Sequence, residues 1–335
     1  MVLKFIDTLC FSTLLALLGF FLTEILLSYW GYTPWQLRSV AVSVLGPDEH
    51  TGWAPVPGRY QKLLQDMTTV EMSINPDGTR PTALDSEQQD MKLIVLGDSV
   101  MYGFGLEDKN TFAWRLQYKL DDVQVINLAV SGYGHTQSLL RFQQYYGGKK
   151  LHKTVVLIRY SDYYIHRDIG VKWWASQLSQ LSRKLNAKLP YSDLDSNGEL
   201  VIHPPENYFF ELPFRERFAS IRIVEEAIAN LGSLGRESRK REIFNQIFEK
   251  LIVEIRKTGA LPVIFHGEDR EGPLLLDELI DRLELTSVSC IHPYGKDPKY
   301  FLPNDPHPGP EINQFWAECL SLQLEPIFAE IAKEN

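Results

Sequence analysis

Cysteine is scarce in this chain, which has only three among its 335 residues. Cys10, Cys290 and Cys319 form no Cys/His spacing of the kind that holds structural zinc, so we expect no metal. Cys290 falls in a predicted strand and Cys319 in a predicted helix. We expect both to pack as small hydrophobic side chains, with a bridge between them in an oxidising compartment as the alternative.

Positive charge is also limited. The formal net charge is −9, and no sustained basic stretch occurs. Nucleic-acid-binding proteins carry basic patches, so this composition argues against nucleic acid as a main partner. The one basic cluster, Arg236 to Arg241, is interrupted by Glu237 and Ser238 and is typical of a solvated helix face.

The first segment of the chain is of a different kind. Phe5 to Trp30 is almost entirely apolar, and a run of roughly 20 such residues suits a bilayer-spanning helix. Tyr29, Trp30, Tyr32 and Trp35, at and after its end, form an aromatic belt. We predict an uncleaved, single-pass membrane anchor over residues 1–32, with the remaining chain extracytoplasmic. A cleaved signal peptide and a buried core helix are the alternatives.

Residues 33–90 show turn signals between short strand-like pieces such as Thr69 to Ile74, which predicts a connecting arm that packs on the main domain. From residue 91 to residue 335, short apolar runs alternate with helical patterns. This alternation predicts an α/β fold, a parallel five-stranded sheet with helices on both faces. The predicted strands are Leu93–Leu96, Val123–Leu128, Thr154–Ile158, Pro262–Phe265 and Val288–Ile291. The predicted helices are Phe112–Leu120, Thr136–Tyr146, Glu242–Lys257, Leu274–Leu283 and Glu311–Ile331.

The alternation breaks over residues 163–235, which we interpret as an insertion at the carboxyl edge of the sheet. Its aromatic residues, Trp173-Trp174 and Tyr208-Phe209-Phe210, either shape a substrate cleft or form a small core of their own. The acidic run from Asp193 to Glu199 begins like a calcium loop, but Pro204 stands where a bidentate Glu is needed. A hairpin turn is the better interpretation of this run.

The chain is organised around Gly97-Asp98-Ser99, which follows the first predicted strand. Parallel sheets place their chemistry at the carboxyl ends of the strands, and a serine there becomes a nucleophile if a base and oxyanion donors are in reach. Taken alone, the tripeptide is also a common strand-ending turn.

Three further segments supply the missing groups. The second strand ends in Asn127, and Gly132 follows in a Gly-rich turn before a helix, a natural anion site. The third strand leads into Ser161-Asp162. The loop before the last helix holds Asp305 two residues before His307, which is the order in which a carboxylate orients an imidazole that serves a serine.

These four segments, in this order, resemble the sequence blocks of the SGNH/GDSL hydrolase family. The resemblance covers residue 92 to the carboxyl terminus apart from the insertion, and the arm resembles that of membrane-anchored bacterial members through Asn75, Gly78 and Arg80. It implies a three-layer, flavodoxin-like α/β/α fold. It also implies Ser99 as nucleophile and His307 as general base in preference to His135.

By the same resemblance, Asp305 orients His307, and the amides of Ser99 and Gly132 with the Ser161 side chain form the oxyanion hole. Asp98, Asn127, Asp162 and Arg80 would contact substrate or support the site. Two positions depart from the family pattern. Ser161 stands where the family has Asn, and many members carry the acid at the position of Asn304.

The sequence thus predicts a membrane-anchored serine esterase, deacetylase or O-acyltransferase. It would act through an acyl-serine on glycan or lipid esters of the cell envelope, without metal or organic cofactor. The alternative is a catalytically inactive protein of the same fold that binds carbohydrate or takes part in envelope assembly.

Overall fold

The computed structural model describes residues 2–35, 44–64, 66, 68–83, 89–171, 174, 188–206, 212–267 and 274–333. The expectations for Trp173 and for Tyr208-Phe209-Phe210 therefore fall outside the described residues.

The centre of the molecule is a five-stranded sheet, built from β5 (Met91–Leu96), β6 (Val123–Asn127), β7 (Thr154–Arg159), β10 (Leu261–His266) and β11 (Thr286–Ser289). All neighbours pair in parallel, in the order β11-β10-β7-β5-β6. Numbered along the chain this order is 2-1-3-4-5 when read from β6, the flavodoxin-like arrangement. The predicted parallel sheet is confirmed. The last strand ends at Ser289, so the prediction that Cys290 lies within a strand is wrong.

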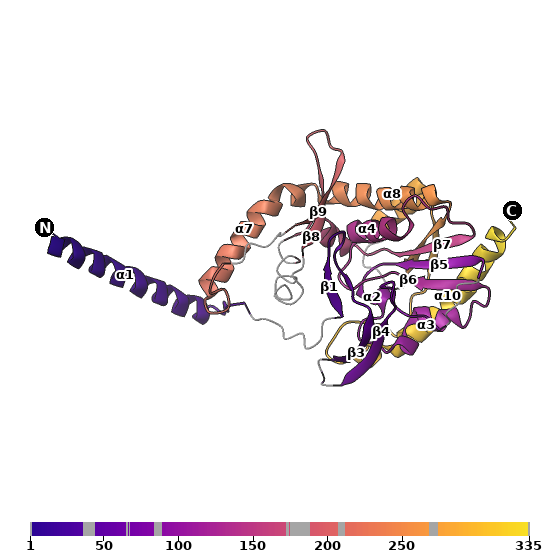
Figure 1. Ribbon diagram of the computed structural model, residues 1–335, viewed down its shortest axis with the longest axis horizontal. Coiled ribbons are helices and arrows are strands. Elements are labelled where there is room, and N and C mark those ends of the chain that lie inside the picture. The colour runs from indigo at the N-terminus through magenta and orange to yellow at the C-terminus, as the bar shows by residue number, and fades with distance from the viewer. Residues whose placement is uncertain are drawn as a thin grey trace.

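Helices cover both faces of the sheet, which makes the predicted three layers (Figure 1). α3 (Phe112–Gln117) and α10 (Pro310–Ile331) lie on one face, and α4 (His135–Tyr146), α8 (Lys240–Thr258) and α9 (Leu274–Leu283) on the other.

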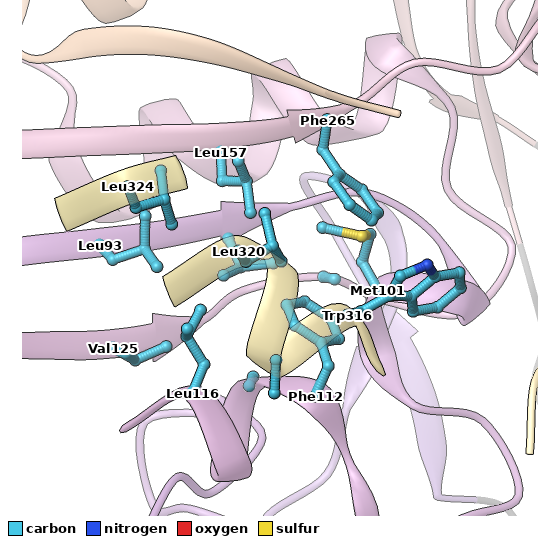
Figure 2. Packing of buried hydrophobic residues seen from close by; sticks show 14 of the residues in the cluster. Leu93, Met101, Phe112, Leu116, Val125, Leu157, Phe265, Trp316, Leu320 and Leu324 are labelled. Carbon is cyan, nitrogen blue, oxygen red and sulfur yellow. The ribbon is translucent and has the colours of Figure 1, made fainter. Parts of the chain in front are cut away.

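Neighbouring residues on one strand point to opposite faces, so each strand feeds both cores. Leu93 lies with Leu116 and Trp316 in one core (Figure 2), whereas Ile94 lies with Phe248 in the other. The near-continuous apolar strands in the sequence reflect this burial on both sides.

Two small hairpins precede the sheet. β1 (Leu45–Asp48) pairs with β2 (Gly52–Pro55), and β3 (Gly58–Leu63) pairs with β4 (Thr69–Ile74), both antiparallel. The chain then joins the main sheet through a bridge between Arg80 and Asn127 at the end of β6. The second hairpin brings arm residues beside the loop that follows β5.

Between β7 and α8 come α5 (Tyr164–Asp168), the hairpin of β8 (Leu189–Leu194) and β9 (Leu200–Glu206), and α7 (Ala219–Ser238). The turn of the hairpin uses the Asp195 carboxylate, which accepts hydrogen bonds from the amides of Asn197 and Glu199 at 2.8 and 2.9 Å. The hairpin interpretation is therefore confirmed. The described residues contain no cluster of ligands suited to a metal ion.

The N-terminal segment forms one long helix, α1 (Val2–Tyr29). Its residues Cys10–Tyr29 have a mean hydropathy of 2.1, and none of this window is buried in the protein. A buried core helix is therefore excluded. The helix is long and apolar enough to cross a membrane, a property that anchors and signal sequences share.

The expectation that Cys290 and Cys319 are separate, packed thiols is wrong. The structure joins them in a disulfide, which ties the segment after β11 to α10. Cys10 is free and exposed on α1.

We expect reduction of this disulfide to lower stability. The bridged residues are 29 apart in sequence, and closing a loop of that length contributes about 3 to 4 kcal/mol in a chain-entropy account. Thermal and denaturant unfolding, with and without a thiol reductant, measures the difference. Cys10→Ser should behave like the parent chain, and equal stability of the oxidised and reduced forms would contradict this prediction.

Candidate active site

The serine side of the site is built by the turn that follows β5. Gly97 has φ of +149°, and a Cβ there would come within 2.7 Å of the Met101 side chain, so only glycine fits. The Asp98 carboxylate accepts a hydrogen bond from the amide of Val100 and so caps α2 (Ser99–Tyr102). This places Ser99 at the first position of α2, at the carboxyl edge of the sheet.

The histidine side of the site is the loop before α10. Its backbone closes on itself through hydrogen bonds from Leu302 N–H to the His307 carbonyl at 2.9 Å and from Asp305 N–H to the Leu302 carbonyl at 3.0 Å. Because these bonds fix the loop, Asp305 and His307 face each other with little freedom. Asn304, the alternative acid position, has φ of +57° at the tip of this loop.

The three side chains form a hydrogen-bonded chain. His307 Nε2 lies 2.7 Å from Ser99 Oγ, and His307 Nδ1 hydrogen-bonds Asp305 Oδ1. The same carboxylate oxygen accepts the His307 amide at 2.9 Å, so Asp305 holds both the ring and the backbone of the histidine. Ser99 is 8% exposed, which leaves the hydroxyl at the floor of the site.

The charge of Asp305 is stabilised in place. Burial alone would raise the pKa of this carboxyl, but hydrogen bonds from the ring and the backbone of His307, together with the nearby charge of Lys62, outweigh burial and lower it. An ionised carboxylate on Nδ1 keeps that nitrogen protonated and leaves Nε2 free to accept a proton from the serine.

The turn after β6 lies beside Ser99. The amide of Val130 donates to the Gly97 carbonyl at 3.1 Å, which ties this turn to the end of β5. Gly132 has φ of +90° and packs against Trp53 and Trp174, where a Cβ would come within 3.2 and 3.3 Å of the two rings. Glycine is therefore required both by the positive φ and by the lack of space for a side chain.

Two arginines, which the sequence analysis did not single out, lie behind the serine. Arg159 and Arg167 each direct Nη1 to the buried Asp98 Oδ2, at 3.1 and 3.2 Å. Burial would raise the pKa of Asp98, but these two guanidinium groups outweigh it and lower the pKa. The sequence did contain a signal for one of them. Arg159 ends the largely apolar strand β7, and a buried charge at such a position needs an oppositely charged partner nearby.

Arg167 also connects the two halves of the site. Its Nη1 donates to the Tyr133 carbonyl at 2.7 Å as well as to Asp98. One guanidinium therefore spans the turn that carries Ser99 and the turn that carries Gly132. Arg159 shares the contact with Asp98 and also donates to the Tyr164 hydroxyl at 3.3 Å.

Three other predicted site residues, Asn127, Ser161 and Asp162, differ in how they relate to Ser99 and His307. Asn127 supports the site from below, donating to the Met101 carbonyl and accepting from the amide of Ala129. Ser161 begins the turn into α5, where its carbonyl accepts from Tyr164 N–H. Within the described part of the chain, no hydrogen bond links the side chain of Ser161 or of the exposed Asp162 to the Ser99–His307 pair.

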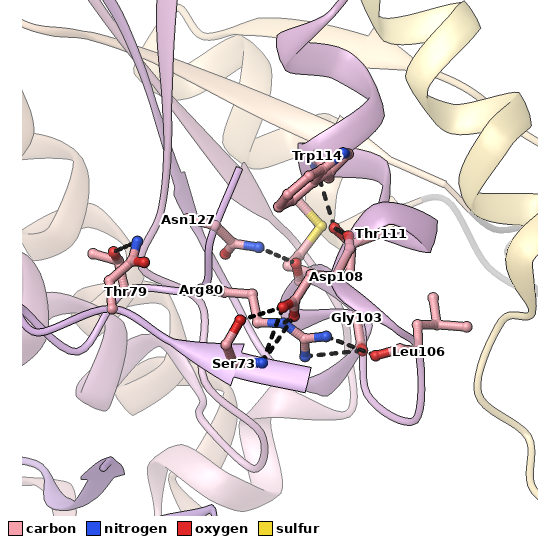
Figure 3. A network of polar contacts seen from close by, with 11 residues as sticks. Ser73, Thr79, Arg80, Gly103, Leu106, Asp108, Thr111, Trp114 and Asn127 are labelled. Carbon is pink, nitrogen blue, oxygen red and sulfur yellow. Dashed lines mark hydrogen bonds and ion pairs between the residues drawn. The ribbon is translucent and has the colours of Figure 1, made fainter. Parts of the chain in front are cut away.

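Arg80 supports the site from the arm and is buried away from it. Its guanidinium pairs with Asp108 at 2.9 Å and donates to the carbonyls of Leu106 and Gly103, as Figure 3 shows. These carbonyls belong to the loop that follows α2. Arg80 therefore holds the loop behind Ser99 in shape.

His135 does not take the role of base. It is fully buried among aromatic rings, including those of Tyr164 and Phe248, and its closest charged neighbour is Asp168 at 3.4 Å. The preference for His307 over His135 as the imidazole beside Ser99 therefore agrees with the geometry.

The arm reaches the histidine through one aromatic ring. Phe104 packs against His307 with ring centroids 4.4 Å apart and ring planes tilted by 30°, and the Lys62 ammonium lies 3.0 Å from the centre of the Phe104 ring. Burial, with a contribution from Arg80, lowers the pKa of Lys62 to about 7, while Asp305 opposes the shift.

A cavity of about 830 Å³ adjoins the histidine loop. It lies between the segment after β11 and the residues before His307, with Asp305 and Asn304 on one wall and apolar side chains such as Phe301 and Leu302 on another. Its size suits a small ligand or an acyl chain.

We expect Lys62→Met to make stability less dependent on pH. In the unfolded chain Lys62 binds a proton below about pH 10.4, whereas in the folded chain it does so only below about pH 7. The unfolded state therefore binds more protons between these values, and the parent chain loses stability as the pH falls from 10 to 7. Unfolding midpoints at both pH values should show a larger gain for Lys62→Met at pH 7. Lys119→Met, at an exposed lysine, is the control, and a pH-independent gain would contradict the assignment.

We expect Arg167 and Arg159 to differ in their effect on turnover. Arg167→Met removes the link between the two turns and should lower kcat on the order of a hundredfold, the effect of misplacing one oxyanion donor. Arg159→Met removes the same charge and the same contact with Asp98 but leaves Tyr133 untouched, so its loss should be smaller. Steady-state kinetics on a chromogenic acetyl ester decides this, and equal losses would show that charge alone matters.

Comparisons with known proteins give matches in solved structures only. No family model and no curated protein matches the chain. A G-D-S-L family lipolytic protein from Desulfitobacterium hafniense is 11% identical over 69% of this chain and 98% of its own, with a TM-score of 0.40. A family two carbohydrate esterase from Clostridium thermocellum, solved with cellohexaose, is 15% identical over 75% of this chain and 66% of its own, with a TM-score of 0.40.

An acetylxylan esterase from Geobacillus stearothermophilus, solved as a catalytic mutant, is 12% identical over 71% of this chain and 94% of its own, with a TM-score of 0.38. Overlaps at this level assign neither family nor activity, so the functional argument rests on the geometry described above. The chain has a flavodoxin-like α/β fold, and the structures it matches across about 70% of its length include G-D-S-L lipolytic proteins and esterases.

Proposed function

We propose that this chain is a serine acyl-ester hydrolase or acyltransferase of the SGNH/GDSL type. The observation that carries the proposal is the hydrogen-bonded chain Asp305–His307–Ser99. A serine hydroxyl needs a base that is itself held in one orientation, and these contacts supply both.

The reaction proceeds in two steps. Ser99 Oγ attacks the ester carbonyl while His307 Nε2 takes its proton, and the carbonyl oxygen becomes an oxyanion. The amides of Ser99 and Gly132 donate to that oxyanion. Collapse of the tetrahedral intermediate breaks the bond to the leaving alkoxide, which receives the proton from His307, and an acyl-serine remains.

In the second step an acceptor hydroxyl attacks the acyl-serine and gives its proton to His307. The acyl group passes to the acceptor, and the proton returns to Ser99. If the acceptor is water the protein is an esterase or deacetylase, and if it is a sugar hydroxyl the protein is an O-acyltransferase. Asp305 stabilises the imidazolium that forms transiently in both steps.

The cell envelope is the proposed location. An N-terminal anchor over residues 1–32, the arm over residues 33–90 and the hydrolase domain over residues 91–335 would place the triad outside the cytoplasm. The Cys290–Cys319 disulfide supports this placement, because such bonds persist in oxidising compartments.

Glycan esters are the substrates we propose first. Trp174 is only partly buried and lies directly against Gly132, so one aromatic ring is available beside the proposed oxyanion donors, with the buried Trp53 packed against it. Aromatic rings of this kind present large amphipathic surfaces that suit sugar rings. The cavity beside the histidine loop leaves room for a lipid acyl chain as well.

A non-catalytic binding protein is the second candidate. It is favoured by one observation: Ser161 stands where the family pattern has Asn, so the third oxyanion donor would be a hydroxyl in place of an amide. A binding protein would keep its ligand affinity when Ser99 is changed.

We expect a fluorophosphonate probe to modify the full chain in detergent once, at Ser99. Ser99→Ala and His307→Ala should abolish the adduct in intact mass spectra, and each should lower ester turnover on the order of a millionfold. Ser196→Ala, at an exposed turn of the β8–β9 hairpin, is the matched control and should label fully. A folded parent chain that takes no probe would reject the hydrolase proposal in favour of the binding protein.

A further inference from the structure

Helix α7 exposes an uncharged face. Val224, Ile228, Leu231 and Leu234 are 47%, 43%, 72% and 61% exposed. Their spacing of three and four residues places them on one side of the helix. The other exposed positions of α7 that have been described, among them Ala227 and Gly232, are also uncharged.

Two of the five charged side chains of α7, Glu225 and Arg236, are buried in the protein. Glu225 is buried, where it pairs with Arg215 at 3.0 Å and accepts from Trp35 Nε1 at 2.6 Å. Arg236 is buried too and donates to the Ile169 carbonyl at 2.8 Å. The other three, Arg222, Glu226 and Glu237, are partly exposed and form ion pairs, Arg222 with Glu226 and Glu237 with Lys240. The most exposed face of α7 is therefore largely apolar, which contact with water does not favour.

The start of α7 is attached to α1. The Glu24 carboxylate accepts hydrogen bonds from the amides of Ala219 and Ser220 at 2.8 and 3.0 Å. Phe20 packs edge-on against Phe218, with ring centroids 4.9 Å apart. A carboxylate inside an apolar helix therefore caps the first turn of α7.

This attachment sets the position of the start of α7 along the axis of α1. Glu24 precedes the aromatic belt that begins at Tyr29, and at 1.5 Å per residue it lies about 7 Å to the apolar side of that residue. Tyr29 and Trp30 are 85% and 67% exposed, as belt residues at a membrane surface would be. Helix α7 begins beside the carboxyl-terminal half of α1 and extends away from it (Figure 1).

We propose that α7 lies on the lipid bilayer, with Val224, Ile228, Leu231 and Leu234 inserted at the headgroup boundary. This rests on the proposal that α1 is a membrane anchor. Lipid is the occupant that the structure supports, because this face continues from the apolar surface of α1 near the level of the belt, and amphipathic helices occupy that position at membranes.

A second contact with the membrane has a structural consequence. α7 leads directly into α8, whose Ile247 and Phe248 are buried against the sheet. A helix held on the bilayer would prevent the α/β domain from rotating freely about α1. The triad would then keep one height and one orientation above the lipid surface.

Spin labels on the full chain in phosphatidylcholine nanodiscs test the proposal. In a Cys10→Ser background, Leu231→Cys and Leu234→Cys should be more accessible to oxygen than to a water-soluble nickel chelate. Glu242→Cys, at an exposed position of α8, is the control and should show the opposite preference. Chelate accessibility at Leu231 and Leu234 equal to that at Glu242 would overturn the proposal.

Two further readouts separate this proposal from those on which it depends. A label on the native Cys10 reports whether α1 is in the bilayer, and fluorophosphonate labelling reports whether the triad is active and the variant folded. Spin–spin broadening at Leu231 that disappears on dilution with unlabelled chain would mean that a second copy covers α7, which also overturns the lipid assignment.

Discussion

The site depends on one contact across the chain, the hydrogen bond between Ser99 and His307, which are 208 residues apart. Each partner is held by its own local structure, the serine by a capped helix after β5 and the histidine by a closed loop before α10. The fold brings them together, because β5 is an interior strand of the parallel sheet and α10 packs on one face of that sheet, against side chains of β5. Little conformational entropy is then lost when the two side chains meet.

The buried charges behind Ser99 are one carboxylate and two guanidinium groups. Asp98 faces two guanidinium groups, so the floor behind Ser99 carries more positive than negative charge. Buried guanidinium groups need fixed acceptors, and Arg167 finds one in the backbone of the Gly132 turn. The spacing between the two proposed oxyanion donors is thereby linked to the insertion, since Arg167 belongs to α5. The arm contributes through Lys62, whose ammonium lies over the Phe104 ring that contacts His307.

Polar groups at the membrane end follow the same logic. Glu24 would be costly in an apolar helix if its oxygens had no donors. The first amides of α7 supply them, so α1 and α7 each satisfy the other's free polar groups. These hydrogen bonds fix the point on α1 at which α7 begins, and α8 follows α7 directly. The exposed face of α7 remains largely apolar.

The sequence by itself determined the local elements. Short apolar runs that alternate with helical patterns predicted all five strands, and the acidic turn at Asp195 was predicted as a hairpin, because these patterns depend on neighbouring residues alone. The order of Asp305 and His307 likewise indicated the histidine side of the site, and Gly97-Asp98-Ser99 its serine side.

Only the tertiary structure decided the contacts between distant segments. It joined Cys290 to Cys319, turned Arg167 onto the Gly132 turn and placed Lys62 over Phe104. None of these pairings has a spacing in sequence that would reveal it. Their partners meet because strand order and helix packing bring the segments together, and that geometry is a property of the whole fold.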